Sequence, residues 1–121
     1  MSNELVRGSV DKVSFDHGIE LLIGGALIRI GGVALLGAGT DTIEFDAENA
    51  AAVPEKLVKL LHIDLQASVS ADSELQFSDA DGKQVMSVPS SSEYESWTAT
   101  LDDGSIAVCG PDGKVAGWSA S

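Results

Sequence analysis

The chain has 121 residues, of which 19 are acidic and 7 are basic, so its net charge is −12 at pH 7. This length fits a single domain, residues 1–121, and a hydrophobic fraction of 44% can fill its core. Nucleic acids and anionic membranes are bound chiefly through Lys and Arg, so the charge balance argues against both as partners. A basic protein partner fits the charge, although a simply solvated acidic surface is the plainer alternative.

The cellular setting follows from cysteine usage and from the apolar segments. A single cysteine, Cys109, excludes a disulfide within the chain and a paired redox motif. No basic and apolar leader is found at the start, which predicts a cytoplasmic protein. Residues 19–39 have the length of a membrane span, but Glu20 and Arg29 interrupt them and glycines divide them into short pieces. We expect buried strands joined by tight turns there.

Alternation of apolar and polar residues predicts several strands in the first third of the chain. Residues 10–16 alternate, with Val13 and Phe15 on the apolar face of the expected strand. Short apolar or alternating runs follow, separated by glycines and polar residues. The strands expected from them are 19–23, 26–30, 33–36 and 40–45.

Helical periodicity is confined to residues 46–62. Pro54 is unfavourable inside a long helix but suits the first turn of a shorter one, so we expect a regular helix from about Pro54 to His62. Leu57, Leu60 and Leu61 would share its buried face. A protonated His62 near the end of that helix would be stabilised by the helix dipole.

The C-terminal half reads as a meander of short strands. Asp-Gly pairs, at Asp81–Gly82, Asp103–Gly104 and Asp112–Gly113, separate alternating runs and are typical of two-residue hairpin turns. The strands expected here are 65–70, 74–78, 84–88, 94–101, 105–109 and 114–118. The resulting prediction is an α+β fold: a predominantly antiparallel β meander, forming a sheet, roll or small barrel, with one helix packed on it.

Motifs that carry chemistry are weak in this sequence. Residues 79–82, DADG, lack the ligand spacing of a calcium loop, and neither His17 nor His62 has a second ligand at a suitable spacing. Cys109 lies in an apolar strand, a setting in which a thiol is inert. The sequence therefore predicts no catalytic residue, no metal site and no cofactor, and favours a protein that is not an enzyme.

Residues 93–97, EYESW, combine the only tyrosine and one of two tryptophans with two glutamates. One interpretation places Trp97 in the core, with Glu95 accepting its indole N–H at the rim and Trp118 stacking nearby across the sheet. The other interpretation is an exposed aromatic surface with an acidic rim, as in protein-binding hot spots. The candidate partner-binding residues are therefore Glu93, Tyr94, Glu95, Trp97 and Trp118.

From about residue 73 the chain reads LQFSDADGKQVMSV and then YESWTATLDDGSIAVCGPDGKVAGW. These segments resemble a family of small bacterial proteins, mainly from high-GC Gram-positive organisms, classed as a domain of unknown function. The stretch HGIELLI and the Pro54 helix start are also similar, whereas relatives often carry Pro-Gly-Gly where this chain has residues 110–113. The resemblance implies no activity. The positions that match are Tyr94, Glu95, Trp97, Pro111, Gly113 and Trp118.

Two functional hypotheses follow from these observations. The first is a non-catalytic protein-interaction domain that binds a basic protein, a description that an immunity protein neutralising a toxin would fit in size and charge. The alternative is a small-molecule-binding or hydrolytic domain with a pocket between the helix and the sheet, marked by converging titratable groups. Strand-rich domains also pair through edges, so a homodimer using the Trp118 end is expected as well.

Overall fold

The computed structural model describes residues 3–15, 18–37, 42–47, 55–91, 95–110 and 114–118. Most of the described residues are in strands, and one short 3-10 helix, Glu55–Leu60, is the helical element among them. No helix within the described ranges is long and apolar enough to cross a membrane. The eleven strands found in them are β1 (Asn3–Ser14), β2 (Ile19–Ile23), β3 (Ala26–Ile30), β4 (Val33–Leu36), β5 (Ile43–Asp46), β6 (Asp64–Val69), β7 (Leu75–Ser78), β8 (Gln84–Val88), β9 (Trp97–Thr100), β10 (Ile106–Cys109) and β11 (Val115–Trp118).

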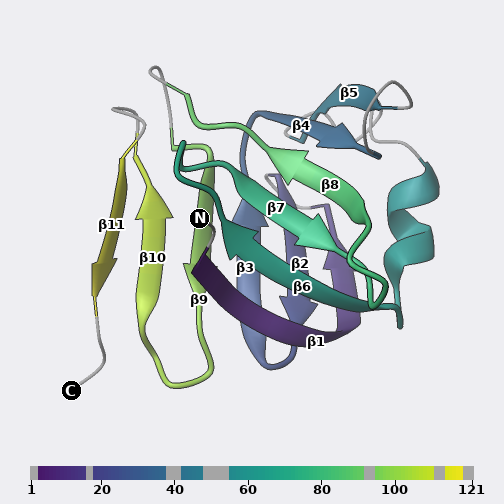
Figure 1. Cartoon of the computed structure of the whole chain (residues 1–121), viewed down its shortest axis with the longest axis horizontal. Coiled ribbons are helices and arrows are strands. Elements are labelled where there is room, and N and C mark those ends of the chain that lie inside the picture. The colour runs from purple at the N-terminus through teal and green to yellow at the C-terminus, as the bar shows by residue number, and fades with distance from the viewer. Residues whose placement is uncertain are drawn as a thin grey trace.

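All strand pairs are antiparallel, and the strand order is β11-β10-β9-β3-β2-β1-β6-β7-β8-β4-β5. The long strand β1 divides this sheet into two layers, because its first part pairs with β6 as far as Ser9 and its second part pairs with β2 from Val10 onward. We call the β6-β7-β8-β4-β5 side layer A and the β2-β3-β9-β10-β11 side layer B. Figure 1 shows β6 and β7 in front of β2 and β3.

The core lies between the two layers. Period-two alternation turns every second side chain inward, so Leu21 and Ile28 of layer B meet Phe77 and Met86 of layer A in one buried cluster. Each of these four side chains has no exposed surface. The expected apolar face of β1 is only partly present: Val13 packs against the core, whereas Phe15 lies beyond the end of β1 and is 37% exposed.

The α+β prediction is wrong in its helical part. In place of a regular helix over 54–62, the described residues contain a 3-10 helix, Glu55–Leu60, and no α-helix. Two further i→i+3 bonds follow it, and the chain is then tied to β1 by the bond from His62 N–H to Val10 O, 2.7 Å long. A helical segment of six residues forms few i→i+4 bonds to offset the cost of α-helix nucleation, and short 3-10 segments are common as connectors.

The leucine pattern was compatible with either kind of helix. Leu57 and Leu60 are buried and Leu61 is half-buried, as expected for the face that packs on the core. A spacing of three residues falls on one face in a 3-10 helix as well as in an α-helix. His62 does not end an α-helix but has φ of 70°, in the left-handed region.

The hairpin turns differ from the expected two-residue type. In the β7–β8 turn, Gly82 N–H donates to Asp79 O and Asp79 N–H donates to Lys83 O, while only Gly82 has positive φ. This is a type I turn followed by a glycine bulge. The β9–β10 turn repeats it with Gly104. Residues 112–113 lie outside the described ranges. The two-residue turn with two positive φ values is instead Gly24–Gly25, between β2 and β3.

The β6–β7 turn has the same hydrogen-bond pattern, but Ser73 occupies the left-handed position with φ of 63°. A non-glycine residue is strained there, so Ser73→Gly should raise the free energy of unfolding by about 0.5–1 kcal/mol. The converse change, Gly82→Ser in the β7–β8 turn, should lower it by a similar amount. Urea unfolding at constant slope measures both, and destabilisation by Ser73→Gly would contradict the assigned turn geometry.

Candidate functional site

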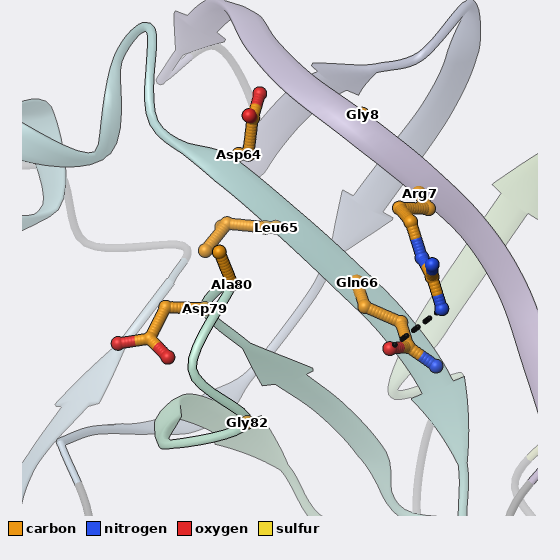
Figure 2. Close-up of a pocket in the computed structure, with 8 residues that line it drawn as sticks. All are labelled: Arg7, Gly8, Asp64, Leu65, Gln66, Asp79, Ala80 and Gly82. Carbon is orange, nitrogen blue, oxygen red and sulfur yellow. Dashed lines mark hydrogen bonds between the residues drawn. The ribbon is translucent and has the colours of Figure 1, made fainter.

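A groove of about 410 Å³ opens on the solvent side of layer A. Figure 2 shows it where β1 and β6 run side by side and the β7–β8 turn approaches them, with Ala80 of the turn next to Leu65 of β6. Three segments far apart in sequence therefore form one site. Its lining residues are Arg7, Gly8, Asp64, Leu65, Gln66, Asp79, Ala80 and Gly82.

Strand alternation places the polar groups of the groove. Leu65 points into the core with 1% of its surface exposed, so its neighbours Asp64 and Gln66 emerge on the solvent side. Arg7 is opposite Gln66 in the β1–β6 register, and its guanidinium donates to Gln66 Oε1 at 3.3 Å (Figure 2). The alternation that turns Leu65 into the core therefore also places the polar side chains of the groove.

The turn side of the groove is held by Asp79. Its Oδ1 accepts the backbone N–H groups of Asp81 and Lys83, each at 3.0 Å, so the side chain closes the turn on itself. Gly82 then supplies the positive φ that reverses the chain, and a Cβ at Gly82 would have nothing within 4 Å. Asp79 therefore stabilises the turn. Only one of its carboxylate oxygens accepts these bonds, and the carboxylate lies at the rim of the groove.

Charge in the groove is predominantly negative. Asp64 and Asp79 contribute two carboxylates, whereas Arg7 is the cation among the lining residues. The Arg7 guanidinium lies 2.9 Å from Glu4 Oε1, so this cation is already balanced by a third carboxylate. A groove of this composition attracts a cationic group such as an ammonium or guanidinium.

The β9–β10 turn uses a related arrangement without forming part of the groove. Asp103 Oδ1 accepts the Ser105 backbone N–H at 2.8 Å and also the Ser105 hydroxyl. The Ser105 hydroxyl, and then its backbone N–H, lower the pKa of Asp103. This carboxylate belongs to layer B, and it provides a natural comparison for the turn aspartate of the groove.

The residues of EYESW do not form one exposed patch in the described structure. Glu93 and Tyr94 lie outside the described residues, and Glu95 is exposed. Trp97 is only 1% exposed and belongs to the core cluster. Its indole N–H donates to the backbone oxygen of Ser73 at 3.2 Å rather than to Glu95. Trp97 is therefore a packing residue that ties layer B to the β6–β7 turn of layer A.

The strand register separates the two tryptophans. Trp97 pairs with Cys109 on β10, whereas Trp118 pairs with Ile106, at the other end of the same strand. Trp118 is thus not opposite Trp97, and the expected cross-strand neighbourhood is not formed by the backbone. The reason is the antiparallel register, in which Gly110 N–H donates to Lys114 O at the Cys109 end of the pair.

Cys109 is a buried free thiol next to the same contact. Ser96 Oγ donates to its sulfur at 3.6 Å, and the thiol lies 3.7 Å from the backbone oxygen of Ser73. Two layer B side chains thus converge on one layer A carbonyl. Packing and hydrogen bonding within the core therefore account for a buried cysteine at this position.

The groove was not found from sequence, and it does not lie between the helix and the sheet as the small-molecule alternative required. Arg7 falls in a part of β1 that was not expected to be a strand, and DADG was considered only as a turn or calcium loop. Asp64 precedes an expected strand. Strand pairing between β1 and β6 brings Arg7 and Asp64 to the same groove. Alternation along a single strand does not reveal which strand it pairs with.

The fold and the groove together define an all-β, two-layered antiparallel protein with an acidic groove on the outer side of one layer. The chain belongs to the Family of unknown function (DUF6188), whose family model matches residues 1–119. This match confirms the expected membership of a family without assigned function. Neither the curated proteins nor the solved structures contain a match to the chain.

Proposed function

We propose that the chain is a non-catalytic, cytoplasmic protein-interaction domain whose groove receives a lysine or arginine side chain of a basic protein partner. The observation that supports this proposal is the local charge of the groove. Asp64 and Asp79 line it, and Arg7 is already paired with Glu4. A cationic side chain entering between β6 and the β7–β8 turn would therefore meet uncompensated negative charge.

The groove and the whole acidic surface contribute to binding in different ways, because their electrostatic interactions differ in strength and range. Exposed carboxylates contribute only about 0.2–1 kcal/mol each to an ion pair, so the groove selects a cationic anchor without holding a partner by itself. The net charge of −12 acts at longer range by steering a basic partner toward the domain and raising the association rate. An immunity protein that neutralises a basic toxin is one class of protein that uses this combination.

The proposal is tested with a short oligo-arginine peptide and two double variants of equal charge change. Asp64→Asn with Asp79→Asn removes both groove carboxylates, and the amide oxygen introduced by Asp79→Asn can still accept the two backbone N–H groups that close the turn. Asp102→Asn with Asp103→Asn makes the same change in charge at the β9–β10 turn, where the new amide oxygen can likewise accept the Ser105 N–H. Calorimetry at about 0.15 M salt gives the affinities.

We expect the groove variant to weaken peptide binding by roughly three- to thirtyfold, because two exposed charge contacts are lost. The β9–β10 variant should stay within about twofold of the unsubstituted chain, because it alters only the general field. Equal losses in both variants would show that net charge alone binds the peptide, and the groove would then have no role.

A further inference from the structure

Within the described residues the extended sheet ends at β11 and β5, and these two edge strands differ in chemistry. Strand β5 carries Glu44 and Asp46, charged residues of the kind that keep an edge from pairing with another chain. Strand β11 reads VAGW and carries neither a charge nor a proline. Residues 115–117 are also exposed. One edge of the sheet is therefore protected, and the other is open to an added strand.

The backbone of β11 has its unused groups at known positions. Gly110 N–H donates to Lys114 O, which makes residues 110 and 114 a bonded pair. Bonded and non-bonded pairs alternate along an antiparallel ladder, so Ala116 bonds to Val108 of β10 while Val115 and Gly117 direct their N–H and C=O groups outward. These outward groups form the template that a further strand would use.

Among the described residues, no close contact requires a glycine at position 117. Its φ is not in the left-handed region, and a Cβ there would meet only the Ile106 backbone oxygen at 3.5 Å, an ordinary contact. Glycine in a strand interior costs about 0.5–1 kcal/mol relative to alanine. Glycine within a strand often marks a bulge, a bend, or a place where a ligand or another backbone approaches closely, and the last of these fits an edge strand that receives a partner.

The two ends of this edge are oppositely charged. Lys114 precedes β11, and the β9–β10 turn with Asp102 and Asp103 lies beyond its other end, where Trp118 pairs with Ile106. A two-fold axis that pairs β11 with β11 of another copy runs the strands antiparallel, so the lysine end of each copy meets the acidic end of its partner. Parallel addition would bring like ends together.

An opening also lies beside this edge. A space of about 550 Å³ is lined by Leu5 of β1, Val69 of β6 and Val115 of β11, among other residues. Val115 is consequently 39% exposed although it pairs with the buried Cys109. A second β11 would continue layer B over this opening and cover apolar surface that the single chain leaves in water.

We infer that β11 pairs antiparallel with β11 of a second copy of this chain, forming a homodimer with one continuous sheet. The contact is short, which predicts a weak dimer with a dissociation constant of roughly 0.1–1 mM. This inference is independent of the groove, which lies on layer A at the other side of β1.

The test uses two lysine substitutions at matched positions. Val115→Lys and Ile43→Lys each place a charge at the first residue of an edge strand, where the exposed fractions are 39% and 40%. Sedimentation equilibrium up to about 1 mM protein at 0.15 M salt (about 8 Å Debye length) measures association. We expect the unsubstituted chain and Ile43→Lys to dimerise within this range and Val115→Lys to stay monomeric throughout it.

A second measurement addresses the backbone directly. The amide of Gly117 should exchange with solvent several times more slowly as concentration rises through the dimerisation range, while that of Ala116, bonded to β10, should not change. The inference is overturned if the unsubstituted chain stays monomeric to about 1 mM, if Val115→Lys still dimerises, or if Gly117 exchange is independent of concentration.

Discussion

Substitution of Gly8 by alanine should lower the free energy of unfolding by about 2–3 kcal/mol, because the new methyl group would overlap a backbone that cannot retreat. A Cβ at Gly8 would lie 2.7 Å from Gly24 Cα and 2.9 Å from Gly24 N. Gly24 is itself fixed at φ of 53° in the β2–β3 turn, and its N–H donates to Ser9 O where β1 changes layers. Urea unfolding measures the loss.

The same substitution at Gly117 is the matched control. A Cβ there makes only one ordinary contact, so Gly117→Ala should leave the free energy of unfolding of the monomer unchanged or raise it by up to about 1 kcal/mol. Both are glycines within strands, but only at Gly8 would a Cβ overlap another backbone. If Gly8→Ala proves as stable as the unsubstituted chain, the close contact between β1 and the β2–β3 turn is incorrect.

Trp97→Ala should cost about 3–5 kcal/mol of unfolding free energy, since it removes a fully buried aromatic side chain and leaves a cavity between the layers. It also removes the indole N–H that binds Ser73 O, the contact between layer B and the β6–β7 turn. Trp97→Phe keeps most of the volume and loses that hydrogen bond, so an intermediate loss is expected. Denaturant unfolding followed by circular dichroism measures both.

Ile106→Ala serves as the comparison for this prediction. Ile106 is 36% exposed on β10, so its truncation should cost no more than about 1 kcal/mol. A loss at Trp97 as small as that at Ile106 would contradict the core position of the tryptophan and would return it to the candidate partner-binding surface.

Strand positions were largely accessible from sequence because each carries its own periodicity. The segments 19–23, 26–30 and 33–36 coincide with β2, β3 and β4, since glycine-rich turns bound each of them. The N-terminal part of β1 was missed because Gly8 and Arg7 break the alternation there. Gly8 leaves room for the β2–β3 turn and Arg7 lines the groove, and both are features of tertiary structure.

The helix and the turn types could not be resolved by local pattern. Leucines at 57 and 60 suit a 3-10 helix as well as an α-helix, and the choice depends on how soon the chain must rejoin β1 at Val10. Asp-Gly likewise suits both a two-residue turn and a type I turn with a bulge. The choice between them is made by the register of the flanking strands.

The groove could not be predicted because its parts are joined only by strand order. Arg7, Asp64 and Asp79 are separated by long stretches of sequence, and the β1–β6 pairing brings the first two together. By contrast, EYESW is a concentrated local signal that led to a proposed patch, and the structure uses its tryptophan for packing. Composition favoured a basic protein partner without giving a position for its binding, and that partner stays a prediction.

Nuclear magnetic resonance titration of the ¹⁵N-labelled chain with a short oligo-arginine peptide tests the proposed binding groove most directly. We expect saturable shifts of the backbone amides at Arg7, Asp64–Gln66 and Asp79–Lys83, the segments that line or close the groove. Small shifts spread over all exposed carboxylates, or shifts centred on Asp102 and Asp103, would contradict it.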